Sequence, residues 1–157
     1  MSIFSKAIGG AICLAAFNID AVSIRATVFG CSKDKGHYYC DKPAFTKVLK
    51  DATTVAVESQ PFNQISTKAL QGLARELGKS VQSGPAELIF ELEPADSDGT
   101  VYYGPNDREL ATLRVYTAGA NGKHGQLIWV ESVVGQPDKP WAVVVQSAIR
   151  QFKADLK

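Results

Sequence analysis

The sequence predicts an α+β domain of two layers, in which a mostly antiparallel sheet of about four strands has helices packed on one face. The chain has 157 residues, which is the size of a single domain. Its apolar residues alternate with polar ones in some segments and recur every three to four residues in others. These segments follow one another in the order β-α-β-β-β-α, and one sheet with helices on one side accommodates that order economically.

The first strand and the first long helix lie in the first half of the chain. Residues 53–58, TTVAVE, are rich in β-branched side chains, and the two valines share a face. A helix is expected from an N-cap at Ser66 to about Lys79, because Gly78 stands where a left-handed C-terminal cap belongs. The apolar residues of this helix form one stripe at helical spacing: Leu70, Leu73, Ala74 and Leu77.

The segment 87–93, ELIFELE, has the clearest strand pattern in the chain. Alternation separates it into two sets, Leu88, Phe90 and Leu92 on one face and Glu87, Glu91 and Glu93 on the other. We expect the leucine and phenylalanine face to be buried and the glutamate face to be largely solvated. The row of glutamates is therefore interpreted as a solvated surface and not as a cation site.

Two further strands and a turn follow in the last third of the chain. Residues 110–117 and 126–134 are expected to pair across a turn at Asn121 and Gly122, since an Asn-Gly pair is a strong hairpin signal. The second of these strands is apolar on both faces, so we expect it to be central in the sheet. One face is expected to carry Leu127, Trp129, Glu131 and Val133, and the other Ile128, Val130 and Val134.

A closing helix is expected after Pro140, which suits the first helical position. Apolar residues then recur at helical spacing and form a stripe that faces the core: Trp141, Val144, Val145, Ala148, Ile149 and Phe152. A shorter helix is also expected at Pro43, with Phe45, Val48 and Leu49 facing inward.

Composition excludes two classes of protein. Seventeen basic residues against sixteen acidic ones give a net charge of +1, which lacks the basic excess typical of nucleic-acid binding. The sequence contains no run of 18 apolar residues, so it predicts no transmembrane helix.

The N-terminus indicates export. Lys6 precedes an apolar run at 7–17, which resembles the charged and apolar regions of a secretory signal peptide. We expect residues 1–23 to be a signal peptide, 24–52 an irregular segment and 53–157 the α+β domain. The predicted location is periplasmic or secreted. The alternative is a cytoplasmic protein in which the apolar run is a buried helix.

Three cysteines bear on the compartment. Cys13 would leave with a signal peptide, so Cys31 and Cys40 are a possible disulfide pair in an oxidising compartment. Two free thiols in the cytosol are the alternative. A lipid anchor on Cys31 is less favoured, because Phe29 occupies a position where a lipobox has a small residue. A metal site of Cys31, His37 and Cys40 is also less favoured, since no further ligands complete it.

No motif in the sequence predicts a catalytic, cofactor or metal site, and no cofactor is expected. Gly78-Lys79-Ser80 resembles the end of a phosphate-binding loop, but it ends a helix where such a loop starts one. Tyr102, Tyr103 and His124 are possible surface contacts. As a hairpin-tip residue, His124 is expected to have a solvated imidazole.

The C-terminal two-thirds of the chain resembles a family of bacterial envelope proteins known as domain of unknown function 4136. The matching segments are Leu113-Arg114-Val115, Leu127-Ile128-Trp129-Val130-Glu131 and Ile149-Arg150-Gln151-Phe152, with Glu87-Leu88-Ile89-Phe90 before them. The resemblance implies a periplasmic or lipid-anchored bacterial domain for which no reaction is known.

These observations predict an exported envelope domain that is non-catalytic and binds an unknown protein or another envelope component. One alternative is a small hydrolase-like enzyme whose site is built from scattered residues such as Asp107, His124 and Glu131. A pocket that holds His124 beside a carboxylate would favour the enzyme. The other alternative is a cytosolic interaction module.

Overall fold

A computed structural model describes residues 30–35, 37–95 and 108–157. The residues predicted to be a signal peptide, and Tyr102, Tyr103 and Asp107, lie outside the described residues. No helix within the described ranges combines the length and the apolar character needed to span a membrane.

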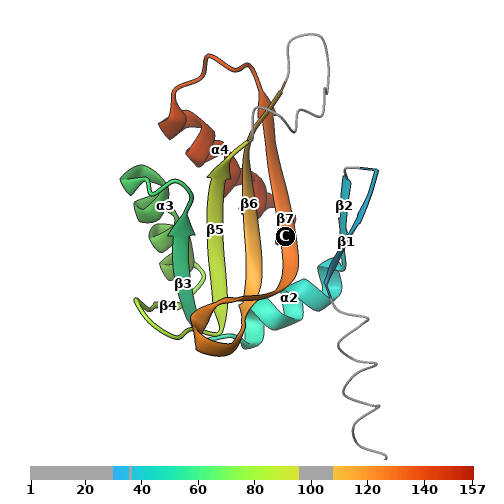
Figure 1. Cartoon of the computed structure of the whole chain (residues 1–157), viewed down its shortest axis with the longest axis vertical. Coiled ribbons are helices and arrows are strands. Elements are labelled where there is room, and N and C mark those ends of the chain that lie inside the picture. Colours follow the sequence, from blue (N-terminus) through green and yellow to red (C-terminus); the bar gives the residue numbers. More distant parts are fainter. Residues whose placement is uncertain (1–29, 36, 96–107) are drawn as a thin grey trace, which may run out of the picture.

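The predicted α+β class is confirmed, with one more strand in the main sheet and an additional hairpin (Figure 1). The strands are β1 (Cys31–Asp34), β2 (His37–Cys40), β3 (Thr54–Ser59), β4 (Ser80–Val81), β5 (Leu88–Pro94), β6 (Arg108–Ala118) and β7 (His124–Gly135). The helices are α2 (Lys42–Asp51), α3 (Gln64–Glu76) and α4 (Trp141–Asp155), with a short 3₁₀ turn, η1 (Ala120–Gly122), between β6 and β7.

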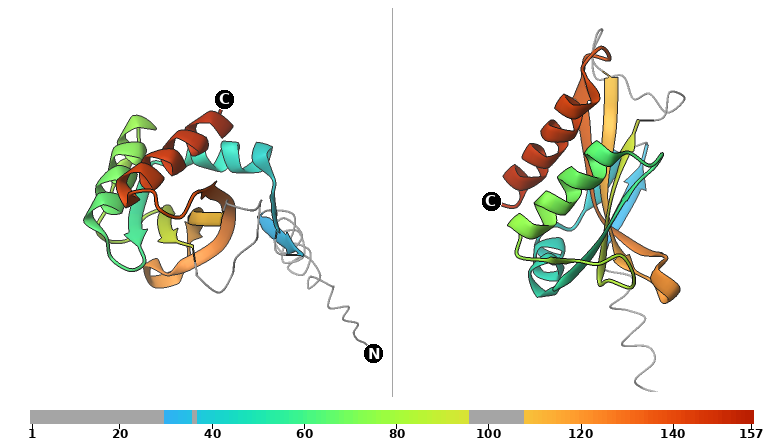
Figure 2. Two further views of the ribbon diagram at one scale, coloured as in Figure 1. Left: turned by 90° about the horizontal axis from the view of Figure 1, so that it is seen from above. Right: turned by 90° about the vertical axis from the view of Figure 1, so that its left-hand side faces the viewer.

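The main sheet has the order β4-β3-β5-β6-β7, and β1 pairs with β2 in a separate hairpin. β3 is parallel to both of its neighbours, whereas β5, β6 and β7 are antiparallel to one another. The three helices lie on one face of the main sheet, which leaves the other face without a helical layer (Figure 2). The strand that the sequence did not predict, β4, is only two residues long and therefore too short to show alternation.

The interpretation of 24–52 as irregular is wrong for the part that the structure describes. α2 starts at an Asp41 cap, whose side chain accepts a hydrogen bond of 3.0 Å from the backbone N–H of Ala44. As expected for the short helix, Phe45 and Leu49 are buried, with exposed fractions of 1% and 5%. The core therefore begins before residue 53, and α2 belongs to the domain.

The start of α3 differs from the prediction. Asn63 caps it by accepting hydrogen bonds from the backbone N–H groups of Ile65 and Ser66, at 2.9 and 3.2 Å. Ser66, which was predicted as the cap, is a fully buried residue in the first turn. The predicted C-terminal cap is confirmed, because Gly78 has a left-handed φ of 72° and follows the last helical turn.

The face of β5 that was expected to be solvated is largely covered. Leu88, Phe90 and Leu92 are buried as predicted, but Ile89 and Glu91 on the opposite face are also buried, at 1% and 3% exposure. The cover comes from β6 and from the β6–β7 hairpin, which bends across the sheet toward β3 (Figure 1). This bend brings the turn end of the hairpin, with His124, onto the face without helices.

The β6–β7 turn forms as predicted. β7 differs from the prediction in its position in the sheet and in which of its side chains share a face. Asn121 and Gly122 both have left-handed φ values, 61° and 71°. β7 is the last strand of the sheet and is not central. The β1–β2 hairpin and α2 contact it, which explains why apolar residues occur on both of its faces. A register shift after Val115 places Ile128 in the core although it was expected on the opposite face from Trp129.

α4 closes the core with the predicted stripe. Pro140 precedes the helix as its N-cap and is not its first residue, and Val144, Val145, Ala148 and Phe152 are buried. Three aromatic rings meet beneath the helices: Phe45 stacks on Trp129 with centroids 4.6 Å apart, and Phe152 meets Phe45 edge-on at 5.9 Å. These contacts join α2, β7 and α4 into one hydrophobic core.

Candidate functional site

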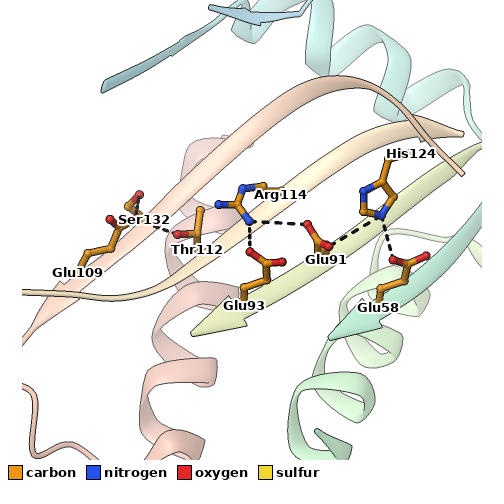
Figure 3. A network of polar contacts seen from close by, with 8 residues as sticks. All are labelled: Glu58, Glu91, Glu93, Glu109, Thr112, Arg114, His124 and Ser132. Carbon is orange, nitrogen blue, oxygen red and sulfur yellow. Dashed lines mark hydrogen bonds and ion pairs between the residues drawn. The ribbon is translucent and has the colours of Figure 1, made fainter. Parts of the chain in front are cut away.

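A row of charged side chains crosses the face of the sheet that has no helices (Figure 3). Glu58 of β3 is paired in register with Glu91 of β5, and Glu91 is paired with Arg114 of β6. Residues paired in this way point to the same side of a sheet, and their Cβ atoms lie about 5 Å apart. Adjacent strands therefore place two carboxylates and a guanidinium side by side.

His124 joins this row from the bent end of the β6–β7 hairpin. Its Nε2 lies 2.9 Å from Oε2 of Glu58 and 3.8 Å from Oε1 of Glu91. Its ring stacks on the ring of Tyr116, with centroids 4.1 Å apart and planes 13° from parallel. His124 is exposed, as expected at the end of the hairpin, but the bent hairpin also packs its imidazole against two carboxylates and an aromatic ring, which the sequence did not predict.

Glu91 is the most buried member of the row, with only 4% of its side chain exposed. Burial raises the pKa of its carboxyl group, and the neighbouring charge of Glu93 adds to that rise. The hydroxyl of Tyr116 donates a hydrogen bond to Glu91, and burial together with this carboxylate raises the pKa of Tyr116 to about 12. Tyr116 therefore keeps its proton at neutral pH and serves as a donor.

Arg114 is shared unequally between two carboxylates. Its Nη1 forms a hydrogen-bonded ion pair with Glu93, whereas its separation from Oε2 of Glu91 is 3.7 Å. Beyond it, Glu109 accepts hydrogen bonds from the hydroxyls of Thr112 and Ser132, at 2.8 and 2.6 Å. The face thus presents a polar surface that is held in place by its own hydrogen bonds.

Within the described residues, carboxylates outnumber cations in the part of the face around His124. Glu58, Glu91 and Glu93 supply three carboxylates, while Arg114 supplies one permanent positive charge and is paired with Glu93. His124 lies between the other two carboxylates. Chemically, the cluster offers carboxylate and imidazole donor atoms to a ligand that carries positive charge or hydrogen-bond donors.

The other residues considered for an enzyme site are not brought to His124. Glu131 pairs in register with Leu113, whose side chain is in the core, so Glu131 points to the helical side of the sheet. There its pKa is raised to about 7, first by burial and then by a hydrogen bond and charge repulsion with Asp155. Glu131 and His124 therefore lie on opposite faces.

Trp129, two residues before Glu131 in the sequence, is 8% exposed and packs in the core. Its Nε1 is buried and forms no hydrogen bond of good geometry within the described part of the chain. The indole nevertheless slightly lowers the pKa of Glu131. This supports a structural role for Trp129.

The predicted disulfide is present and closes the β1–β2 hairpin between Cys31 and Cys40. Both sulfur atoms are used in this bond, so the cysteine and histidine metal site considered from the sequence does not form. The histidine of that set, His37, is an exposed residue of β2.

Part of the candidate site could be predicted from the sequence. Alternation correctly predicted that Glu91 and Glu93 share a face of β5, and the same spacing of two residues puts Arg114 and Tyr116 on one face of β6. It gave no signal for Glu58 beside His124, because 66 residues separate them and the contact depends on the bend of the hairpin.

Comparisons with known proteins identify no family for this chain. No protein-family model matches it and no curated protein matches it, so the resemblance to domain of unknown function 4136 stays a prediction. One solved structure with some likeness is the PelC dodecamer, in a single-residue variant, from Paraburkholderia phytofirmans. That comparison has 11% identity and a TM-score of 0.35, and covers 68% of this chain and 87% of the other.

A second solved structure is described as a "putative lipoprotein" from Caulobacter crescentus CB15. It has 19% identity and a TM-score of 0.33, and the comparison covers 74% of this chain and 95% of the other.

Proposed function

We propose that this protein is an exported envelope domain that binds another envelope component without catalysing a reaction, and that the face without helices is its binding surface. The disulfide between Cys31 and Cys40 is the observation that carries the export part of the proposal. Disulfides persist in oxidising compartments such as the periplasm and are rare in reducing ones. The signal-like sequence at 1–23 supports the same location.

The disulfide also bears on a lipid anchor. A lipoprotein carries its lipid on the sulfur of its first mature cysteine, and in this structure the sulfur of Cys31 is bonded to Cys40. The same atom cannot hold both groups. We therefore propose a soluble exported form, and the resemblance to the envelope family of unknown function supports this without requiring an anchor.

The proposal of binding follows from the composition of the polar face. Its residues are fixed by stacking and ion pairs, as with Tyr116 against His124 and Arg114 against Glu93, so a ligand would meet a preorganised surface. The excess of carboxylates around His124 favours a partner with basic or hydrogen-bond-donating groups.

The mature protein from the envelope fraction of its native host tests the export part. Intact-mass measurement should show cleavage near Ser23 and a mass two hydrogens below that of the reduced chain. An uncleaved Met1 together with free thiols at Cys31 and Cys40 would contradict export and support a cytosolic interaction module instead.

The binding part is tested by photo-crosslinking in that host. A photoreactive residue at Val130, in register with Arg114 on the polar face, should give a defined protein or glycan adduct. The matched control is the same residue at Val143, which is exposed on α4 in the helical layer. Equal adducts from both positions, or none from Val130, would contradict the assignment of the face.

A small hydrolase is the second candidate, because His124 lies 2.9 Å from Glu58, as an imidazole oriented by a carboxylate would. No serine, threonine or cysteine forms a hydrogen bond with His124 in the described part of the chain, so a hydrolase would need water as its nucleophile. Hydrolysis of ester or amide model substrates that is lost in His124→Gln and retained in His37→Gln would favour this candidate over a binding protein.

A further inference from the structure

Glu58, Glu91 and His124 bring three potential metal ligands together on the face without helices (Figure 3). One oxygen from each carboxylate and one imidazole nitrogen all lie within 4.8 Å of one another. We propose that these three side chains form a binding site for a divalent transition-metal ion. Zinc suits the site best, because it accepts imidazole and carboxylate ligands together. This goes beyond the proposed binding function, which requires no metal.

The distances between the donor atoms are close to those of a zinc site. With metal–ligand distances of about 2.0–2.2 Å, a tetrahedral arrangement separates the ligand atoms by about 3.4 Å. Nε2 of His124 lies 2.9 Å from its nearest oxygen on Glu58 and 3.8 Å from that on Glu91. These two values lie on either side of the required separation. The third separation, between the two carboxylate oxygens, is no more than 4.8 Å. Rotation of the partly exposed Glu58 and His124 side chains would therefore bring the three atoms around one ion.

The backbone fixes the three ligands independently of an ion. Glu58 and Glu91 are paired residues of neighbouring parallel strands, so the sheet sets the separation of their backbones. His124 begins β7, and its ring is held by stacking on Tyr116 of β6. Because the ligands come from three different strands, the fold assembles the site before any ion binds.

The buried carboxylate of Glu91 is a second and independent observation that favours a cation. Its side chain is 4% exposed, and the nitrogens of Arg114 and His124 are 3.7 and 3.8 Å away, beyond hydrogen-bond length. The one neutral donor, Tyr116, leaves the other lone pairs of the carboxylate available. A buried carboxylate that accepts no hydrogen bond from its neighbouring cations is only partly compensated, and a divalent ion between Glu91 and Glu58 would complete that compensation.

The site is open on one side. The side chains of Glu58 and His124 are 35% and 34% exposed, so solvent reaches the cluster. Three protein ligands with an accessible fourth position are typical of zinc sites that hold a water molecule or an external ligand. A side chain of the binding partner could occupy the same position.

Calorimetric titration of zinc into the full chain tests the proposal. The protein should carry no histidine tag and should be dialysed against a chelator before the titration at pH 7. We expect one zinc ion per chain, and at least a tenfold weaker affinity in His124→Gln. The matched control is His37→Gln, because His37 is the only other histidine and lies exposed on β2. Its zinc affinity should be unchanged.

A second pair of variants tests the carboxylates. Glu58→Gln should weaken zinc binding to a similar extent, whereas Glu76→Gln on α3 should leave it unchanged. Far-UV circular dichroism of each variant checks that the fold is retained. Visible absorption of the cobalt-loaded protein gives a further readout, since intense d–d bands indicate a tetrahedral site and should disappear in Glu58→Gln.

The outcomes distinguish a metal site from a histidine that only forms hydrogen bonds with the same carboxylates. Stoichiometric zinc binding that depends on His124 and Glu58 supports the proposal. Absence of binding in the unmodified protein, or binding that persists in both His124→Gln and Glu58→Gln, overturns it.

Discussion

The indole N–H of Trp141 donates a hydrogen bond of 3.0 Å to the hydroxyl of Ser66, and this contact joins the first turns of α4 and α3. Ser66 is fully buried, so its hydroxyl has no access to water. Near the other ends of the same helices, Lys153 forms an ion pair with Glu76. The two helices therefore run in the same direction and are held together at both ends.

Replacing Trp141 by phenylalanine should destabilise the protein by about 1–3 kcal/mol, because the buried hydroxyl of Ser66 loses its donor. Ser66→Ala should also be destabilising, since it leaves the indole N–H of Trp141 without its acceptor. The double variant should cost less than the sum of the two single changes. Urea denaturation of the four proteins measures this coupling, and strictly additive costs would contradict the hydrogen bond.

Trp129 should be the most sensitive of the aromatic core positions. Its ring stacks on Phe45 and is 8% exposed, so Trp129→Ala should cost about 3–5 kcal/mol of the free energy of unfolding. Trp129→Phe is the control, and it should cost less than half as much, because it keeps a ring and the indole N–H makes no hydrogen bond of good geometry within the described residues. A denaturation midpoint for Trp129→Ala equal to that of the unmodified protein would mean that the ring is exposed.

The sequence predicted most of the helical layer because one side of each helix is buried. The stripe of α4, from Val144 to Phe152, is read correctly from spacing alone. The N-cap residue of α3 was harder to predict. Asn63 and Ser66 both carry suitable side chains, and tertiary contacts decided between them, since Ser66 is occupied by Trp141 from a distant helix.

The candidate site could be predicted only in part, because alternation assigns a face but not what covers it. The pattern placed Glu91 on a polar face, and a polar face was assumed to be wet. Register shifts within the β6–β7 pair and the bend of this hairpin then bring His124 over Glu91 and Glu58. Bulges depend on the pairing of two strands and leave no periodic signal in either one.

Glu87 should contribute to stability at neutral pH and lose that contribution in acid. Its Oε2 accepts hydrogen bonds from the backbone N–H groups of Thr53 and Thr54, at 2.6 and 2.9 Å, and these bonds lower its pKa to about 2. Because the unfolded pKa is near 4.5, the stabilisation is complete above that pH and is lost as the pH falls toward 2.

Melting temperatures of Glu87→Gln measured between pH 7 and pH 2.5 test this prediction. The variant should melt below the unmodified protein at pH 7, and the difference should shrink as the pH approaches 2.5. Asp138→Asn, at an exposed position between β7 and α4, is the control and should show no such convergence. A constant difference between Glu87→Gln and the unmodified protein would show that the hydrogen bonds to Thr53 and Thr54 do not depend on the charge.

Glu131 should have the opposite effect on pH dependence. Burial and the neighbouring carboxyl of Asp155 raise its pKa to about 7 in the folded protein, so the folded state holds a proton that the unfolded state releases near pH 4.5. The resulting stabilisation is complete below about pH 4.5 and is lost as the pH rises through 7. Because Glu131 is only half-buried, we expect a loss of about 1–2 kcal/mol between pH 5 and pH 8. Urea denaturation should show this loss in the unmodified protein and a flatter profile in Glu131→Gln, which mimics the protonated form. Parallel profiles for the two proteins would exclude Glu131 as the titrating group.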